Sequence, residues 1–591
     1  MCGFLVNFKI YPNGFDQSIL EERLTRLSHR GPDQRNIWKN ENIWMGHQRL
    51  ILVGGEKSGR QPLVNSNGNA LVYNGEIYNC KELQSKYLSS NFLSDSEILF
   101  ALLNKQGKSI LSELRGMFSF VYYKHAEKRV WLVRDPFGMK PLYYRNTDEG
   151  WEFSSELRAF DHLYPDRIQA EIFQYHMAPL PGHSLYKNVF EVRPGSIKII
   201  GPEVESCNQY VTLGSVFNLA NSIDKQATND YVDEDYFHDL FDRIVKQHLL
   251  ADTSPGILLS GGLDSGCIAL SLRGSPVKSY TMAVSGMDES SIAASLANTI
   301  GISHHIFDSD LSEHIQDVLN AMDGPIGDAS FFPTWNLFNN LRSFEKSVLG
   351  GDGGDEIFFG YPTFEIEALR QKLPNFIFSL GRKFGSNVGS YSNTRINLLE
   401  KLLRFSWGHS DFVMLRQMQY MAAKPMDNLS PKALELILNN FQQTIELEKI
   451  DSNCHWSQVF TYYFRYYLAT QVLTKSDRAS MRHSVELRCP YLDWDLFSKT
   501  FRFPENTFPL LSGRKQVLRD YYNSHTKLKN FSKRGFTAPL YNILPKLEVL
   551  VANQRDRNSR PHDELLGNSL VGLHARYLEL VYEYFHGSID A

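Results

Sequence analysis

A glycine-rich turn between an apolar segment and an amphipathic one constrains the fold of this chain more than any other feature. The turn is Ser-Gly-Gly-Leu-Asp-Ser at residues 260–265. The apolar run at 256–259 is typical of a buried parallel strand, and the apolar side chains of 268–272 can cover one face of a helix. A strand, a glycine-rich turn and a helix direct backbone N–H groups and the positive helix-dipole end at one point. The segment therefore predicts an α/β fold with an anion site that favours phosphate.

Asp264 lies inside this turn. A carboxylate that faces phosphates usually shares a Mg²⁺ ion with them. The turn lacks the Gly-Lys-Ser/Thr ending of a P-loop, which argues against transfer of a γ-phosphate. An ordinary tight turn can also contain Gly-Gly, but the whole segment resembles the pyrophosphate loop of ATP pyrophosphatases, which cleave ATP between the α and β phosphates. The resemblance implies that these residues bind ATP: Ser260, Gly261, Gly262, Asp264 and Ser265, with Gly351 from a second loop.

Strand and helix patterns alternate from about residue 231 to the end of the chain. Strands are expected at 257–259, 278–284, 305–307 and 347–349, and a helix at 290–300. This alternation predicts a parallel, doubly wound sheet that binds ligands at the carboxyl ends of its strands. Residues 362–455 are expected to add helices, with a Gly/Ser interruption near 386–392.

The first 160 residues have a different pattern. Short aromatic or β-branched runs separated by turn residues predict an antiparallel meander, with strands at 117–123, 129–134, 142–144 and 151–154. Ser94 and Asp95 can cap a helix that begins at Ser96 and ends at Asn104.

The length of 591 residues predicts at least two domains. A polar stretch at 201–230, which contains Gly201-Pro202 and scattered Asn, Ser and Thr, is expected to be the linker. The chain is therefore divided into a domain at 2–200 and a second domain at 231–591.

Composition narrows the class of protein. A net charge of −4 gives no basic surplus for nucleic acid, and no apolar run approaches the ~18–20 residues of a membrane span. The six cysteines are sparse and form no CxxC pair, which fits a reducing compartment. We expect a cytoplasmic enzyme without nucleic-acid or membrane partners; the sequence does not decide whether two chains form a homodimer.

Cys2 is a candidate nucleophile. Removal of Met1 would place its thiol and a free α-amine on adjacent atoms, and an amine that titrates near pH ~8 can serve as the base. A cysteine at position 2 is by itself uninformative. Its neighbours are not: four motifs follow in order, namely His29-Arg30-Gly31-Pro32-Asp33, His47-Gln48-Arg49-Leu50, Asn74-Gly75-Glu76-Ile77-Tyr78-Asn79 and Ser94-Asp95-Ser96-Glu97.

Together with Cys2-Gly3, these motifs resemble the glutaminase domain of class II glutamine amidotransferases, and both halves together resemble the asparagine synthetase (glutamine-hydrolysing) family. The resemblance implies an αββα sandwich for the first domain. It also implies that Cys2 attacks glutamine, that Asn74 and Gly75 form the oxyanion hole, and that Arg49, Glu76 and Asp95 bind glutamine. Arg49 suits the substrate carboxylate and Asp95 the substrate ammonium.

A second glycine-rich loop, Gly350-Gly351-Asp352-Gly353-Gly354-Asp355-Glu356, follows the strand predicted at 347–349. By resemblance, Asp264 and Asp355 would hold Mg²⁺ against the pyrophosphate, and Lys515 would stabilise developing negative charge. The run at 476–493 also resembles a signature of the family.

Asp352 departs from the family, which commonly has Glu at this position beside the acceptor. We expect a glutamine-dependent, ATP-driven amidation of a carboxylate through an acyl-adenylate, with aspartate as the first candidate acceptor. The alternative acceptor is another carboxylate, such as a uronic acid of a surface polysaccharide or a specialised-metabolite intermediate. A tRNA-modifying pyrophosphatase and a degenerate scaffold protein fit less well, because Cys2 and the metal ligands are present.

Overall fold

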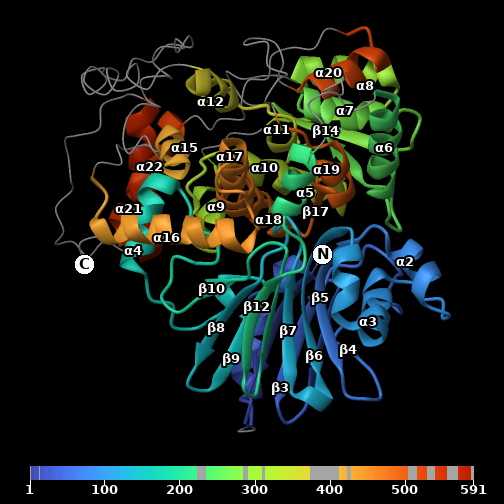
Figure 1. The fold of residues 1–591 in the computed structure, drawn as a ribbon, viewed down its shortest axis with the longest axis vertical. Helices are drawn as coiled ribbons and strands as arrows, with labels where there is room; N and C mark the ends of the chain where they lie inside the picture. The colour runs from blue at the N-terminus through green and yellow to red at the C-terminus, as the bar shows by residue number, and fades with distance from the viewer. Residues whose placement is uncertain are drawn as a thin grey trace.

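The structure is a computed structural model. It describes residues 2–11, 14–222, 234–283, 290–308, 313–372, 412–421, 428–503, 515–528, 540–554 and 570–586. Figure 1 shows two parts in contact: a sandwich of two antiparallel sheets below, and a larger part with a parallel sheet and many helices above.

The sandwich consists of two six-stranded sheets. The first has the order β10 (Phe190–Glu191), β8 (Tyr143–Thr147), β9 (Gly150–Ser154), β1 (Cys2–Phe8), β3 (Ile43–Arg49) and β2 (Gln34–Lys39). The second has the order β12 (Val204–Gln209), β11 (Ser196–Gly201), β7 (Arg129–Arg134), β6 (Gly116–Lys124), β5 (Ala70–Ile77) and β4 (Leu63–Val64). The four predicted strands are confirmed, each end within three residues of the expected bounds, but the single meander is wrong: β6 and β7 pair in one sheet, whereas β8 and β9 pair in the other.

Alternating side chains build the four layers, because successive residues of a strand point to opposite faces. In β1, Phe4 and Val6 lie in the core between the two sheets, whereas Leu5 packs against α1 (Gln17–Thr25). In β5, Val72 faces the other sheet, whereas Tyr73 belongs to the core beneath α2 (Cys80–Tyr87) and α3 (Asp95–Gln106). The predicted αββα sandwich is therefore confirmed.

The helix predicted at 96–104 is α3, and it is capped as expected. Ser94 Oγ accepts a hydrogen bond from the Glu97 backbone N–H, and Glu97 accepts one from the Ser94 backbone N–H. This reciprocal capping box satisfies two otherwise unpaired donors and fixes where Asp95 begins the helix.

The predicted linker at 201–230 differs from the structure in its first part. Residues 204–209 form β12, which pairs with β11 along its whole length, so the sandwich extends beyond residue 200. Residues 213–222 form helix α5 (Leu213–Ser222), and 223–233 lie outside the described residues. All β12 residues are partly or fully exposed, which is why a polar segment can form an edge strand here.

The parallel sheet has five strands in the order β15 (Ser303–Asp308), β14 (Lys278–Ala283), β13 (Gly256–Leu258), β16 (Ser347–Leu349) and β17 (Glu486–Arg488). All four neighbouring pairs are parallel. Strand order reverses at β13, which pairs with β14 on one side and β16 on the other. A reversal of this kind creates the crevice where doubly wound sheets bind ligands, and both glycine-rich loops leave the sheet there.

Helices surround this sheet and extend it (Figure 1). They include α7 (Leu263–Ser271), α8 (Ser290–Ile300), α10 (Phe331–Leu341), α18 (Leu473–Met481) and α20 (Gln516–His525). The helical region predicted at 362–455 contains α12 (Pro362–Lys372), α15 (Val413–Met421) and α16 (Pro431–Leu447), whereas its Gly/Ser interruption lies outside the described residues. A π-helical segment, Tyr462–Val472, leads directly into α18.

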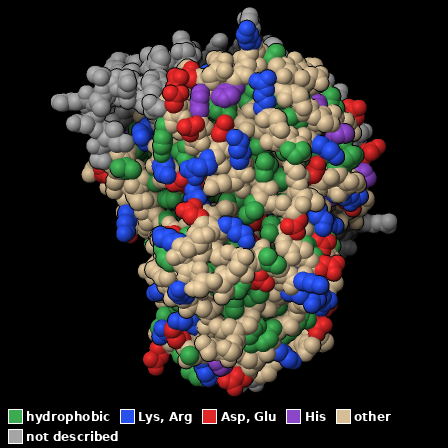
Figure 2. All heavy atoms as spheres, turned by 90° about the vertical axis from the view of Figure 1, so that its right-hand side faces the viewer, with side chains coloured by type: hydrophobic (Ala, Val, Ile, Leu, Met, Phe, Trp, Pro, Cys, Tyr) green, Lys and Arg blue, Asp and Glu red, His purple; other side chains and the backbone are tan. Residues whose placement is uncertain are grey.

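On the face drawn in Figure 2, acidic and basic side chains are interspersed rather than separated by sign. Among the described residues, none of the helices is both long and apolar enough to cross a membrane.

Candidate functional site

Cys2 begins β1 and is almost fully buried, with 7% of its surface exposed. It pairs across the sheet with Arg49, the last residue of β3. The Cys2 backbone N–H donates a hydrogen bond to Asn74 Oδ1 at 3.0 Å. The side chain of Asn74 therefore holds Cys2 with its oxygen, while its buried nitrogen Nδ2 has no hydrogen-bond partner among the described residues.

Burial raises the pKa of the Cys2 thiol, while the Leu50 backbone N–H and the charge of Arg49 act in the opposite direction. The thiol is therefore protonated near neutral pH and requires a base before it can attack.

Gly75 lies between Asn74 and Glu76 in β5, in a backbone conformation that requires glycine. Its φ is +152°, and a Cβ at this position would lie 2.1 Å from the Met117 carbonyl oxygen. Only glycine fits there. Glu76 is buried on the same face of β5 as Asn74, and its Oε2 lies 3.6 Å from Arg488 Nη2 in β17. Burial and Asp95 raise the pKa of Glu76 against the opposing charge of Arg488.

Arg49 and Asp95 supply opposite charges near the Cys2 thiol, and both influence its pKa. Arg49 donates hydrogen bonds to Gln34 Oε1 at 2.9 Å and to the Val53 carbonyl oxygen at 3.3 Å. Asp95 Oδ2 accepts a 2.6 Å hydrogen bond from the Tyr73 hydroxyl. Burial raises the pKa of Asp95, and the Tyr73 hydroxyl lowers it. The structure thus brings together the predicted residues Cys2, Asn74, Arg49 and Asp95, with Glu76 directed toward the second part of the molecule.

The turn at 260–265 joins β13 to α7 as predicted. Ser265 Oγ accepts a hydrogen bond from the Ser260 backbone N–H at 3.1 Å, and the Gly262 backbone N–H donates to Ser260 Oγ at 3.4 Å. Gly261 has φ +73°, a conformation that favours glycine. Asp264 lies in the first turn of α7 and is buried.

The second glycine-rich loop packs against the first. A Cβ at Gly354 would lie 2.8 Å from Asp264 Oδ1, and one at Gly351 would lie 3.0 Å from Asp264 Cβ. A Cβ at Gly360 would lie 1.8 Å from Asp355 Oδ1. Glycines therefore permit the close approach of the two carboxylate-bearing loops.

Lys515 lies between the two carboxylates. Its Nζ is 2.6 Å from both oxygens of Asp264 and 2.6 Å from Asp355 Oδ1. Lys515 itself is buried and is the N-cap residue that precedes α20. Three predicted residues that are far apart in the sequence thus converge at the switch point of the parallel sheet, where a positive charge is already accommodated between two carboxylates.

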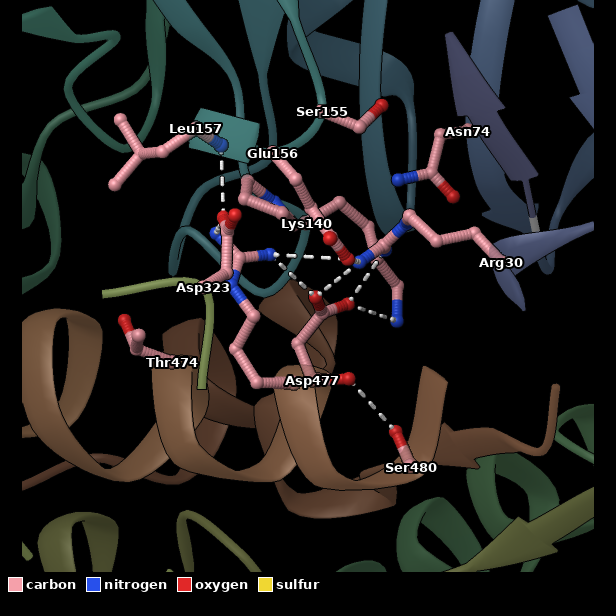
Figure 3. Close-up of polar contacts among 12 residues, drawn as sticks. Arg30, Asn74, Lys140, Ser155, Glu156, Leu157, Asp323, Thr474, Asp477 and Ser480 are labelled. Atoms are coloured by element: carbon pink, nitrogen blue, oxygen red, sulfur yellow. Dashed lines mark hydrogen bonds and ion pairs between the residues drawn. The ribbon is translucent and has the colours of Figure 1, made fainter. Parts of the chain in front are cut away.

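Asp352 also lies in the second loop, and its Oδ2 accepts a 2.6 Å hydrogen bond from Ser476 Oγ. Ser476 belongs to α18, the helix formed by the signature-like run that begins at this residue. Asp477, the next residue of α18, contacts the sandwich instead. Its carboxylate oxygens accept hydrogen bonds from Arg30 Nη1 at 2.8 Å and Nη2 at 3.0 Å (Figure 3).

The sequence did not predict that Arg30, Asp477 and Arg488 form contacts between the two parts of the molecule. Arg30 and Asp477 lie within the quoted motifs, but nothing in the motifs indicates that they pair. Arg488 Nη1 donates to the carbonyl oxygens of His248 and Leu250 at 2.7 and 2.8 Å. Two pairs, Arg30 with Asp477 and Glu76 with Arg488, connect the sandwich to the parallel-sheet part.

Comparison with known proteins agrees with this arrangement. Residues 1–211 match the glutamine amidotransferase domain model, and residues 236–579 match the asparagine synthase model. Asparagine synthetase [glutamine-hydrolyzing] 1 of Bacillus subtilis (strain 168) is 26% identical over 568 residues, which is 91% of this chain and 87% of that protein.

Two other relatives show the same extent of similarity. Asparagine synthetase [glutamine-hydrolyzing] 3 of Bacillus subtilis (strain 168) is 26% identical over 85% of this chain and 81% of its own length. Amidase chry2 of Gibberella zeae is 26% identical over 90% of this chain and 85% of its own length. The match to the asparagine synthase model covers more than half of the chain, and the convergence of Asp264, Asp355 and Lys515 agrees with it. The chain therefore belongs to the asparagine synthetase family, with a class II glutamine amidotransferase domain ahead of its asparagine synthase domain.

Proposed function

We propose that this protein transfers the amide nitrogen of glutamine to a carboxylate at the expense of ATP, releasing AMP and pyrophosphate. The observation that carries the proposal is the convergence of Asp264 and Asp355 on Lys515 at the switch point, in a chain that also buries Cys2 against Asn74. The first arrangement suits an ATP site and the second suits amide hydrolysis.

Glutamine hydrolysis would begin at Cys2. After removal of Met1, the α-amine takes the thiol proton and Sγ attacks the amide carbon of glutamine. The tetrahedral intermediate collapses to a thioester as ammonia leaves with that proton, and water then releases glutamate. Asn74 Nδ2 and the Gly75 backbone N–H would stabilise the oxyanion. In other enzymes, the loss of one such donor raises the activation barrier by roughly 3–4 kcal/mol.

The two ends of glutamine require opposite charges. We assign Arg49 to the α-carboxylate, because its planar guanidinium can form two parallel hydrogen bonds. Asp95 is assigned to the α-ammonium. The Tyr73 hydroxyl and the backbone N–H groups of Ile77 and Ser96 hold the Asp95 carboxylate in place. Glu76 completes the assigned set at the edge that faces Arg488.

In the second domain, the loop containing Ser260, Gly261, Gly262 and Ser265 would bind the pyrophosphate of ATP together with Gly351. Magnesium is typically held by one or two carboxylates together with substrate phosphates, and the Asp264–Asp355 pair fits such an ion. When bound, magnesium would neutralise charge on the phosphates. The Lys515 ammonium would stabilise the charge that develops as the acceptor carboxylate attacks the α-phosphorus and pyrophosphate leaves.

Ammonia would then displace AMP from the acyl-adenylate to give the amide. We place its route across the contact between the two parts, where Glu76 and Arg488 face one another. A closed route would keep ammonia from being protonated by bulk water.

Aspartate remains the first candidate acceptor, which would make the product asparagine. The alternative is a different carboxylate, and Asp352 supports it, because Ser476 occupies one oxygen of a side chain that is a methylene shorter than the family's usual glutamate. Incubating the purified protein with amide-¹⁵N glutamine, MgATP and a panel of carboxylates tests both. The labelled amide, found by mass spectrometry, identifies the acceptor. A protein that transfers no label to any acceptor, and hydrolyses no glutamine, would contradict the proposed function.

A further inference from the structure

Arg30 links Cys2 to the second domain through a continuous set of buried contacts. Its Nε donates a 3.1 Å hydrogen bond to the Cys2 carbonyl oxygen, while Nη1 and Nη2 both contact Asp477 of α18. The Arg30 side chain is completely buried, and the Asp477 side chain is 3% exposed. A paired fork of this kind fixes the orientation of a guanidinium more strongly than a single contact does.

The electrostatics around Asp477 keep it ionised. Burial alone would raise its pKa, but the charges of Arg30, Lys140 and Arg478 hold the pKa of Asp477 below its usual range. Glu156 is the second acidic partner of Arg30, with its Oε1 2.7 Å from Nη1 (Figure 3). Arg30 therefore lies between a carboxylate of its own domain and one of the other domain, and only Asp477 contacts both of its terminal nitrogens.

Cys2 is the first residue of its strand, so few contacts fix its backbone. Asn74 Oδ1 accepts from its N–H, and Arg30 Nε donates to its carbonyl oxygen. These contacts hold the two ends of the same residue, and the direction of its Cα–Cβ bond, and therefore the position of Sγ, depends on both. Displacement of Arg30 would rotate the nucleophile without removing any group that binds glutamine.

We propose that Asp477, a residue of the synthetase domain, is a positioning residue for the glutaminase: it orients Arg30, which holds Cys2. The inference rests on the proposed glutaminase function of Cys2. It implies that an isolated sandwich domain would lack one of the supports of its own nucleophile.

Steady-state glutamine hydrolysis, assayed as glutamate release without ATP or an acceptor, tests this role. Asp477→Asn keeps the size of the side chain but removes its charge, and we expect kcat to fall roughly 10–100-fold, the usual cost of losing a partner that orients an active-site group. KM for glutamine should change by less than about threefold, because Arg49 and Asp95 are untouched.

The combination with Arg30→Ala separates positioning from general damage. If Asp477 acts through Arg30, the double variant should be no slower than Arg30→Ala alone. Effects that multiply would overturn the proposal, as would an Asp477→Asn variant that keeps the wild-type kcat.

Asp323 provides the matched control. It is also a fully buried carboxylate of the second domain that contacts the sandwich, accepting hydrogen bonds from the Leu157 and Arg158 backbone N–H groups at 2.7 Å. Asp323→Asn should lower the melting temperature but leave kcat for glutamine within about threefold. An equal loss of kcat in this control would show that any disturbance of the interface is sufficient, and the proposal would fail.

Arg30→Lys tests the same role if Asp477→Asn does not fold. Lysine retains the positive charge beside Asp477 and Glu156 but has neither the fork nor Nε, so kcat should fall as in Asp477→Asn. Wild-type kcat in Arg30→Lys would overturn the proposal. A wild-type protein that hydrolyses no glutamine would contradict the proposed function itself, which distinguishes the two failures.

Discussion

Ser476 Oγ lies 2.6 Å from Asp352 Oδ2 and donates a hydrogen bond to it across the crevice of the parallel sheet. The contact joins the glycine-rich loop, which contains Asp352, to helix α18, which contains Ser476. If the acceptor binds beside Asp352 as proposed, both residues would line its site.

We predict that Asp352→Glu changes the choice of acceptor. One methylene of fit corresponds to ~1–3 kcal/mol, or about 10–200-fold in discrimination. The ratio of kcat/KM for aspartate to that for a uronic acid such as glucuronic acid should rise by a factor in this range, measured by mass spectrometry of the amide products. Ser476→Ala is the companion variant and should lower turnover with every acceptor. An unchanged ratio in Asp352→Glu would show that this position does not face the acceptor.

The two activities should be separable at Cys2. Cys2→Ala should abolish glutamine-dependent amide formation while preserving formation from ammonium salts, because the ATP site lies in the other domain. Retention of Met1 should have the same effect, since the base would become an amide nitrogen. Cys80→Ala, which changes another buried cysteine of the sandwich, is the control and should keep both activities. Loss of both activities in a folded Cys2→Ala protein would contradict a division of labour between the domains.

Bond cleavage in ATP should occur between the α and β phosphates. We expect AMP and pyrophosphate as products, identified by ³¹P NMR, and ADP with phosphate would exclude this assignment. Asp355→Asn should remove most of this activity with little change in melting temperature, since Asp355 contacts Lys515 at the crevice rather than packing in the core. Asp495→Asn, which alters a carboxylate paired with Arg115 at the domain contact, should retain ATP cleavage.

Stability should fall as the solution becomes mildly acidic, and His248 should contribute to this fall. Burial lowers the pKa of His248 to about 3, and its ring lies against that of Tyr78, with centroids 3.7 Å apart and planes tilted by 33°. The unfolded chain takes up a proton near pH ~6.5 whereas the folded chain does not, so stability is lost as the pH falls below that value. One such group costs about 1.4 kcal/mol per pH unit.

Melting temperatures at pH 7 and pH 5.5 measure this effect. His248→Gln should show a smaller drop than the wild type between these values. An equal drop in both proteins would mean that other groups account for the whole acid sensitivity.

The sequence predicted the strands that have ordinary patterns. β13 and β16 are short, mainly apolar runs, and β14 contains Tyr280 and Thr281, residue types that favour strands; the structure confirms all three close to the expected bounds. The sequence did not predict β17, because Glu486-Leu487-Arg488 contains two charged residues. Their burial is offset by their mutual ion pair and by the contacts of Arg488 with Glu76 and with the His248 and Leu250 carbonyl oxygens. β12 differs from the linker predicted there. A strand at the edge of a sheet can be polar, and its residues then lack the apolar pattern of a strand.

The sequence also predicted the candidate site residues better than the residues that hold them in position. Asp264, Asp355 and Lys515 were expected together because their motifs resemble those of the family, and they converge. The contact between Arg30 and Asp477 joins residues 447 positions apart. Each of them is an ordinary charged residue until the fold buries both, so local pattern could not reveal the pair.

The adjacency of Ser476 and Asp477 on α18 limits how such enzymes can be recombined. A chimera that joins this glutaminase to a foreign synthetase would lose the carboxylate beside Arg30 unless the donor helix supplies one at the same register. Conversely, reshaping the acceptor pocket at residue 476 disturbs the peptide unit that carries residue 477. If Ser476 lines the acceptor site and Asp477 supports Cys2, as proposed, one helical turn would influence both the range of acceptors and the release of ammonia, and a change in either should be accompanied by a compensating change in the other.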